Sequence, residues 1–197
     1  MTSFLSDWAT RARRWAHGQP YAIWYDRAYR LPFASIEAST GIDPRRADMV
    51  LSYLVGSGFL LAGDVRTPSR IRYEDLARVH TPELLESLQD PAAIAQAFAV
   101  DASDVVVDEV VHTIRIACGG TLDAAREALG TRGPTLNLLG GFHHAGRARG
   151  GGFCIVNDIA VAVAAVRREG FKKRVAVLDL DAHPPDGTAD CFAEDPS

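Results

Sequence analysis

The chain has 197 residues, of which 47% are hydrophobic and 23% are charged, and its formal net charge is −4. This length and composition suit one globular domain with a sizeable core. The negative charge gives no basic surface for direct nucleic acid binding, and no uncharged apolar run is long enough to span a membrane. The three cysteines have no C-x-x-C spacing, which favours a reducing, cytoplasmic compartment.

The first half of the chain predicts one strand followed by helices. We expect residues 1–20 to form a short amphipathic helix on the surface, and residues 21–25 to form the first strand. Asp43-Pro44 and Thr81-Pro82 are each typical of a helix N-cap followed by proline at the first helical position. Both segments therefore predict the starts of helices.

A long helix is predicted next, over residues 104–129, because apolar side chains recur there at helical spacing. Gly119-Gly120 predicts an interruption of this helix at a point where another backbone packs closely. Residues 135–139 predict the strand that follows.

The last third of the chain predicts a helix and then a strand. Asn157 or Asp158 begins the helix, whose residues 159–166 are apolar on every side and are expected to be buried. The β-branched run at residues 175–178 suits a strand that is buried on both faces. Strand, helix and strand in this order predict a right-handed crossover in a parallel sheet.

Three polar residues of metal-binding type follow this last predicted strand. Asp179, Asp181 and His183 occupy alternate positions, which share one face of an extended segment. Parallel sheets bind ligands at the carboxyl ends of their strands. The spacing therefore predicts two carboxylates and an imidazole together at a ligand site.

Two adjacent histidines, His143 and His144, follow the preceding predicted strand and a Gly-Gly turn. Such a pair is rare in packing roles, because each buried imidazole needs a hydrogen-bond partner. Asp179 and Asp186 are available as orienting carboxylates. Two imidazoles, each paired with a carboxylate, could serve as a general base and a general acid or electrostatic partner near neutral pH.

These motifs together resemble the histone deacetylase family. The matching stretches are Gly-Gly-Phe-His-His-Ala at 140–145, Gly-Gly-Phe-Cys at 151–154, Asn157-Asp158, Asp-Leu-Asp-Ala-His at 179–183 and Asp186-Gly187. The amino-acid sequences of these motifs are most similar to those of the class IV branch and its bacterial relatives. The resemblance covers nearly the whole chain.

The resemblance implies an α/β fold with a parallel sheet flanked by helices, the three-layer arrangement of arginases and deacetylases. Residues 1–197 would be the N-terminal portion of a single, truncated deacetylase domain. The implied activity is metal-dependent hydrolysis of the amide of an acylated lysine, or of a related acylated amine, on a protein or a small molecule. The family's third metal ligand and its transition-state tyrosine would lie beyond Ser197, so the isolated chain would be inactive.

The metal site follows from the same resemblance. Asp181 and His183 match two ligands of a zinc or iron ion, which would activate water and polarise the amide oxygen. The family also binds a structural potassium ion near Asp179, Asp181 and His183.

The resemblance also assigns catalytic and substrate-binding residues. His143 and His144 match the histidines that move protons, and Asp179 and Asp186 match their carboxylate partners. The last two matched positions, Gly152 and Phe153, would line the acyl-lysine tunnel.

One departure and two alternatives accompany this interpretation. The chain has Pro184-Pro185 where the family has a glycine, which bears on the loop that positions Asp186. An arginase-type manganese amidinohydrolase would need an Asp two residues after His183, where Pro185 stands. The other alternative is a non-catalytic fragment that binds acyl-lysine.

Overall fold

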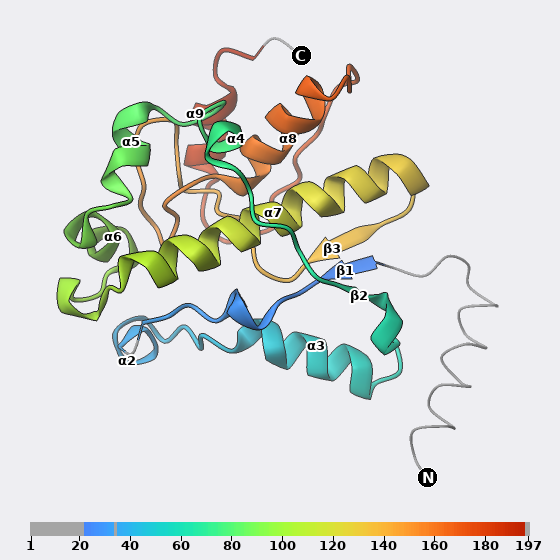
Figure 1. Cartoon of the computed structure of the whole chain (residues 1–197), viewed down its shortest axis with the longest axis horizontal. Coiled ribbons are helices and arrows are strands. Elements are labelled where there is room, and N and C mark those ends of the chain that lie inside the picture. The colour runs from blue at the N-terminus through green and yellow to red at the C-terminus, as the bar shows by residue number, and fades with distance from the viewer. Residues whose placement is uncertain (1–21, 34, 196–197) are drawn as a thin grey trace.

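The computed structural model describes residues 22–33 and 35–195 (Figure 1). The expected helix over residues 1–20 lies outside these residues. In chain order the elements are β1 (Ala22–Trp24), η1 (Arg27–Tyr29), α2 (Ile36–Thr40), α3 (Arg46–Gly56), η2 (Ala62–Asp64), β2 (Val65–Arg66), α4 (Tyr73–Leu76), α5 (Pro82–Ser87), α6 (Pro91–Phe98), η3 (Ala102–Asp104), α7 (Val107–Thr131), β3 (Thr135–Asn137), α8 (Asp158–Arg168) and α9 (Asp186–Phe192).

Within the described residues, three short strands form a parallel sheet in the order β2-β1-β3. Ile23 of β1 pairs with Val65 on one side and with Leu136 on the other. The β1 strand is buried at all three residues, as a central parallel strand flanked by helices requires. The predicted parallel α/β arrangement is therefore confirmed.

Helix α7 crosses the middle of the molecule, between the sheet and helix α8 (Figure 1). The predicted interruption at Gly119-Gly120 is wrong, because α7 continues through both glycines. The predicted close approach is right: a Cβ on Gly119 would lie 1.6 Å from the carbonyl oxygen of Ser69, and one on Gly120 would lie 2.2 Å from the Tyr29 hydroxyl. The glycines thus let neighbouring segments touch α7 without breaking it.

Helix α8 is buried, as its all-round apolar pattern predicts. The side chain of Asn157 caps it by accepting a hydrogen bond of 2.9 Å from the N–H of Ala160. Its residues Val161, Ala162 and Ala165 belong to the main hydrophobic core. The same helix start also anchors the histidine turn described below.

The predicted buried strand at residues 175–178 is wrong. Residues 174–180 form no strand with any part of the chain that the structure describes, and the side chains of Leu178 and Leu180 are 82% and 86% exposed. A β-branched run favours extended backbone, but a strand also needs a neighbour to accept and donate its ladder hydrogen bonds. Without such a neighbour this segment runs over the surface.

The two predicted helix caps have different outcomes. Thr81 caps α5 as predicted, with its hydroxyl accepting from the N–H of Leu84 at 3.3 Å. The Asp43 prediction is wrong in detail, because α3 begins at Arg46 and the Asp43 carboxylate binds the N–H of Arg45 in a local turn.

Two further features bear on the predictions from composition. All three cysteines are free thiols. None of the helices in residues 22–33 and 35–195 is both long enough and apolar enough to cross a membrane.

Candidate active site

The turn that carries the two histidines follows β3 and is held by the start of α8. The buried carboxylate of Asp158 accepts hydrogen bonds from the N–H groups of Phe142, at 2.7 Å, and Gly141, at 3.1 Å. It also accepts one from the Thr121 hydroxyl at 2.5 Å. Burial raises the pKa of Asp158, although these three bonds act in the opposite direction. One carboxylate therefore fixes the backbone immediately before His143.

The other side of the turn is held by the start of α9. The N–H of Thr188 donates to the His143 carbonyl at 2.9 Å. A Cβ on Gly187 would lie 2.4 Å from the His144 carbonyl carbon, so only glycine allows α9 to approach so closely. The amide of Asn157 donates to both the Ala145 carbonyl and the Thr188 hydroxyl. The backbone of the two histidines is thus clamped between α8 and α9.

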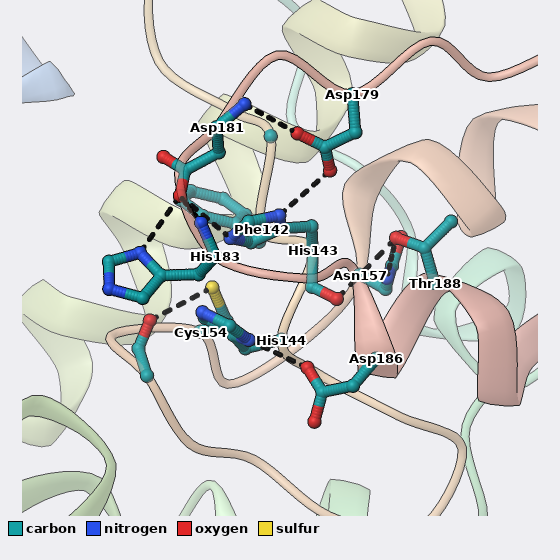
Figure 2. Close-up of polar contacts among 12 residues, drawn as sticks. Phe142, His143, His144, Cys154, Asn157, Asp179, Asp181, His183, Asp186 and Thr188 are labelled. Carbon is teal, nitrogen blue, oxygen red and sulfur yellow. Dashed lines mark hydrogen bonds and ion pairs between the residues drawn. The ribbon is translucent and has the colours of Figure 1, made fainter.

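The imidazole of His143 is buried and pairs with Asp179. Its Nδ1 lies 2.8 Å from Oδ2 of Asp179, and its Nε2 lies 3.9 Å from Oδ1 of Asp181 (Figure 2). The other Asp179 oxygen accepts the N–H of Asp181 at 2.9 Å. That N–H bond, and then the bond to His143, hold the pKa of Asp179 below its ordinary value. Asp179 is therefore an ionised acceptor that orients His143.

The imidazole of His144 pairs with Asp186 at the start of α9. Its Nδ1 lies 2.6 Å from Oδ1 of Asp186 (Figure 2). The second oxygen of that carboxylate accepts from Arg149 at 2.8 Å. Bonds from His144 and then Arg149 lower the pKa of Asp186. Pro184-Pro185 is compatible with this pairing, because the chain turns at Pro185 directly into α9.

Asp181 and His183 lie beside the two histidines, at the surface. The rings of His144 and His183 are 5.8 Å apart between centroids, and those of His143 and His144 are 4.2 Å apart. Asp181 Oδ1 accepts from the His183 N–H at 2.8 Å, as Asp179 does from Asp181. Local turns in which a carboxylate binds the N–H two residues on, and not an extended strand, bring these residues together.

The two predicted metal ligands are of the right kind for one ion, and in the structure they are hydrogen-bonded to each other. Asp181 Oδ1 and His183 Nδ1 are 2.9 Å apart, and two ligand atoms of one tetrahedral zinc lie about 3.3 Å apart. Catalytic zinc has three protein ligands. Within residues 22–33 and 35–195, no three His, Cys, Asp or Glu side chains converge on one point. Among the described residues, these two side chains are thus the predicted ligands, and no third side chain joins them.

Of the two predicted substrate residues, Gly152 lies against the ring of His144. A Cβ on Gly152 would lie 2.4 Å from Cδ2 of His144, and the backbone there has φ +55°. Phe153 also has a positive φ, +65°, and its N–H donates to the Ala97 carbonyl at 2.9 Å. The positive φ of Phe153 is strained for a residue other than glycine. Next to it, Gly152 brings the glycine-rich loop into contact with the His144 imidazole.

Residues outside the predicted site support this arrangement. The buried ring of His80 bridges the Gly146 carbonyl and the Asn157 N–H, both at 3.0 Å. Thr188 and Arg149 also escaped notice, since a lone Thr or Arg in a loop carries no pattern. Asp158 is predicted as a helix start and as part of a family motif, but not as the anchor of the histidine turn. The hydrogen bonds of these residues join segments that are far apart in the sequence, and the periodicity of one segment does not predict such contacts.

Comparisons with known proteins identify the family of this chain. A family model described as the histone deacetylase domain matches residues 41–197. Histone deacetylase 2 of Arabidopsis thaliana is 33% identical over 84% of this chain and 44% of its own length. The acetoin utilization protein AcuC of Bacillus subtilis is 34% identical over 68% of this chain and 36% of its own length.

A solved structure shares the fold. The crystal structure of the HDA15 HD domain superposes with a TM-score of 0.71 at 24% identity, covering 88% of this chain and 52% of that chain. The chain thus spans about half or less of the length of these relatives. The matches support the arginase/deacetylase fold, and nothing in them favours the amidinohydrolase alternative.

Proposed function

The chain belongs to the histone deacetylase family, and from this premise we propose that its two histidine–aspartate pairs serve a metal-dependent deacylase. The substrate would be an acylated lysine, on a protein or a small molecule. The observation that carries the proposal is the pairing of adjacent imidazoles with separate carboxylates, at 2.8 and 2.6 Å.

The pairs can carry out proton transfer in the hydrolysis of an amide. Each carboxylate accepts from Nδ1, so each neutral imidazole keeps the proton on Nδ1 and presents an unprotonated Nε2. One Nε2 can take a proton from the attacking water. The second imidazole can receive that proton on its own free Nε2, directly or through water, and release it to the leaving amine, so that both rings end the turnover neutral. His143, which is buried and faces Asp181, suits the first role, and His144, beside Gly152, suits the second.

Asp181 and His183 would hold the metal, which we propose is zinc or, as an alternative, iron. Bound there, the ion would supply a more acidic water and polarise the amide oxygen. The remaining contributions come from the chain. Its residues orient both imidazoles, and Gly152, which lies against His144, and Phe153, the next residue, would line the substrate channel. A structural potassium ion near Asp179 stays a prediction.

The test uses the full-length protein expressed from its own gene, with acetyl-lysine and long-chain acyl-lysine peptides as substrates. We expect turnover that chelation abolishes and zinc restores. His144→Ala should lower turnover by about 10²–10⁴-fold while zinc remains bound, because its imidazole transfers a proton and ligates no metal. Asp181→Asn should lose both zinc and turnover.

The matched control is His112→Ala, which removes an exposed imidazole from α7. It should leave turnover and zinc content unchanged. Turnover that survives His144→Ala would contradict the proposed catalytic role, and so would loss of zinc in that variant. A folded protein that binds acyl-lysine peptides but never cleaves them would favour the non-catalytic alternative.

A further inference from the structure

Both orienting carboxylates of the site are held at both of their oxygens. Asp179 binds His143 through Oδ2 and the N–H of Asp181 through Oδ1. Asp186 binds His144 through Oδ1 and the guanidinium of Arg149 through Oδ2, at 2.8 Å. In the His144–Asp186 pair, the Arg149 side chain therefore has the role that the backbone N–H of Asp181 has in the His143–Asp179 pair.

A second donor matters more for Asp186 than for Asp179. The Asp186 side chain is 42% exposed, against 19% for Asp179. The terminal torsion of an aspartate is broad, and apart from Arg149 the Asp186 carboxylate is held by His144 and by the backbone N–H of Gly187, which lies next to it in the chain. A donor fixed on the other oxygen defines the carboxylate plane and the direction in which Oδ1 accepts.

The loop that bears Arg149 is itself fixed on α9. The Gly146 N–H donates to the Arg149 carbonyl at 2.9 Å, which closes a tight turn. The N–H of Arg147 donates to the Asp190 carboxylate at 2.8 Å. The loop is therefore hydrogen-bonded to α9 at two residues one helical turn apart: Asp190, which accepts from Arg147, and Asp186, which accepts from Arg149. Because these hydrogen bonds fix the backbone of the loop, they also fix the direction in which the Arg149 side chain extends toward Asp186.

Stability does not explain the Arg149–Asp186 pair. Both side chains are largely exposed, Arg149 at 56%, and exposed ion pairs contribute little to folding. The pair lies one bond from an imidazole of the site, where small changes in orientation affect proton transfer. Its position favours a role in catalysis over one in folding.

We propose that Arg149 is a positioning residue, whose guanidinium holds the Asp186 carboxylate so that His144 keeps its proton on Nδ1 and its Nε2 free. The consequence for turnover rests on the proposed deacylase function, whereas the effect on the imidazole does not. Arg149 makes one hydrogen bond to one oxygen, so a lysine ammonium at this position can reproduce the contact.

The first experiment records the ring nitrogens of His144 by long-range ¹H–¹⁵N NMR in the purified 197-residue chain, at one pH at which the ring is neutral. Wild type and Arg149→Lys should show the proton on Nδ1. Arg149→Gln should lose this preference and show a mixture of the two tautomers. Arg149→Met repeats the test with an apolar side chain of similar length, should the glutamine variant fold poorly.

The matched control is Arg147→Gln, which removes another exposed guanidinium from the same loop. Arg147 pairs with Glu194 and not with Asp186, so its loss should leave the His144 ring as in wild type. An Arg149→Gln spectrum identical to that of Arg147→Gln would overturn the proposal.

The second experiment measures steady-state kinetics of the same variants in the full-length protein. Arg149→Gln should lower kcat by about tenfold with little change in KM, and Arg149→Lys should recover most of the loss. Equal kcat in Arg149→Gln and Arg147→Gln would refute the role in turnover. If wild type itself shows no turnover, the proposed function fails, and the NMR result still decides the role of Arg149 at His144.

Discussion

The buried imidazole of His143 is hydrogen-bonded to one carboxylate oxygen of Asp179, and the other Asp179 oxygen accepts the N–H of Asp181. This double occupancy predicts the effect of Asp179→Asn. The asparagine carbonyl would accept from Asp181, and its NH₂ group would then face Nδ1 of His143. That contact would force the imidazole proton onto Nε2, the nitrogen needed as a base.

We therefore expect Asp179→Asn to lower kcat of the full-length protein by about 10–100-fold. Zinc content and the far-UV spectrum should not change, since Asp179 is not a proposed ligand. The control is Glu194→Gln, which neutralises a strongly exposed carboxylate away from both histidines. A kcat equal to that of this control would show that Asp179 does not orient the base.

The glycine-rich loop offers a second prediction, through two glycines that both have positive φ. A Cβ at Gly152 would meet the His144 ring, whereas a Cβ at Gly141 would meet nothing within 4 Å. From the backbone alone, alanine should cost about 1–2 kcal/mol of folding free energy at either position, because L-residues disfavour this backbone conformation. Only Gly152→Ala should also displace His144.

Denaturant unfolding and kinetics separate the two effects. We expect Gly152→Ala to lose more stability than Gly141→Ala, because its Cβ also clashes with the His144 ring, and to show a larger loss of kcat. If Gly152→Ala retains the kcat of Gly141→Ala, the loop does not constrain His144.

The nearly buried carboxylate of Asp75 supplies a prediction about pH. It accepts from Arg72 at 3.1 Å and from Arg78 at 3.2 Å. Burial raises the pKa of Asp75, but the two arginines together outweigh burial and leave the pKa below its ordinary value of 3.8. A lowered pKa means that the folded state binds the proton more weakly than the unfolded state.

The stabilisation from Asp75 should therefore be complete well above pH 3.8 and be lost as the pH falls through the lower, folded-state pKa. At pH 7 we expect Asp75→Asn to lower the free energy of unfolding by about 1–3 kcal/mol. The difference from wild type should shrink in acid. Urea unfolding of both proteins across this range measures it, and a difference that grows as the pH falls would contradict the sign.

The exposed segment at residues 174–180 gives the last prediction. In the isolated chain, Leu178→Ser should change the free energy of unfolding by no more than about 0.5 kcal/mol, because Leu178 contributes little to the core. Val161→Ala, at a fully buried position of α8, should cost about 2 kcal/mol. Equal losses in the two variants would mean that Leu178 is buried in solution.

The sequence alone determined the features that depend on near neighbours in the chain. The caps at Thr81 and Asn157 are local hydrogen bonds, and the burial of α8 follows from apolar residues on every side. The clustering of Asp179, Asp181 and His183 is also local, because each residue lies two positions from the next. The resemblance to deacetylases rests on such short motifs.

The tertiary structure decided what depends on distant partners. A strand is a property of two segments, so the apolar run at 175–178 could not reveal that its ladder bonds find no partner among the described residues. Likewise, the resemblance already implies that Asp186 partners a histidine, but only the approach of α9 to the histidine turn shows that Arg149 holds the other oxygen of Asp186. These contacts join residues that are distant in the sequence. A hydrogen bond between exposed loop residues produces no periodic pattern of residues from which it could be predicted.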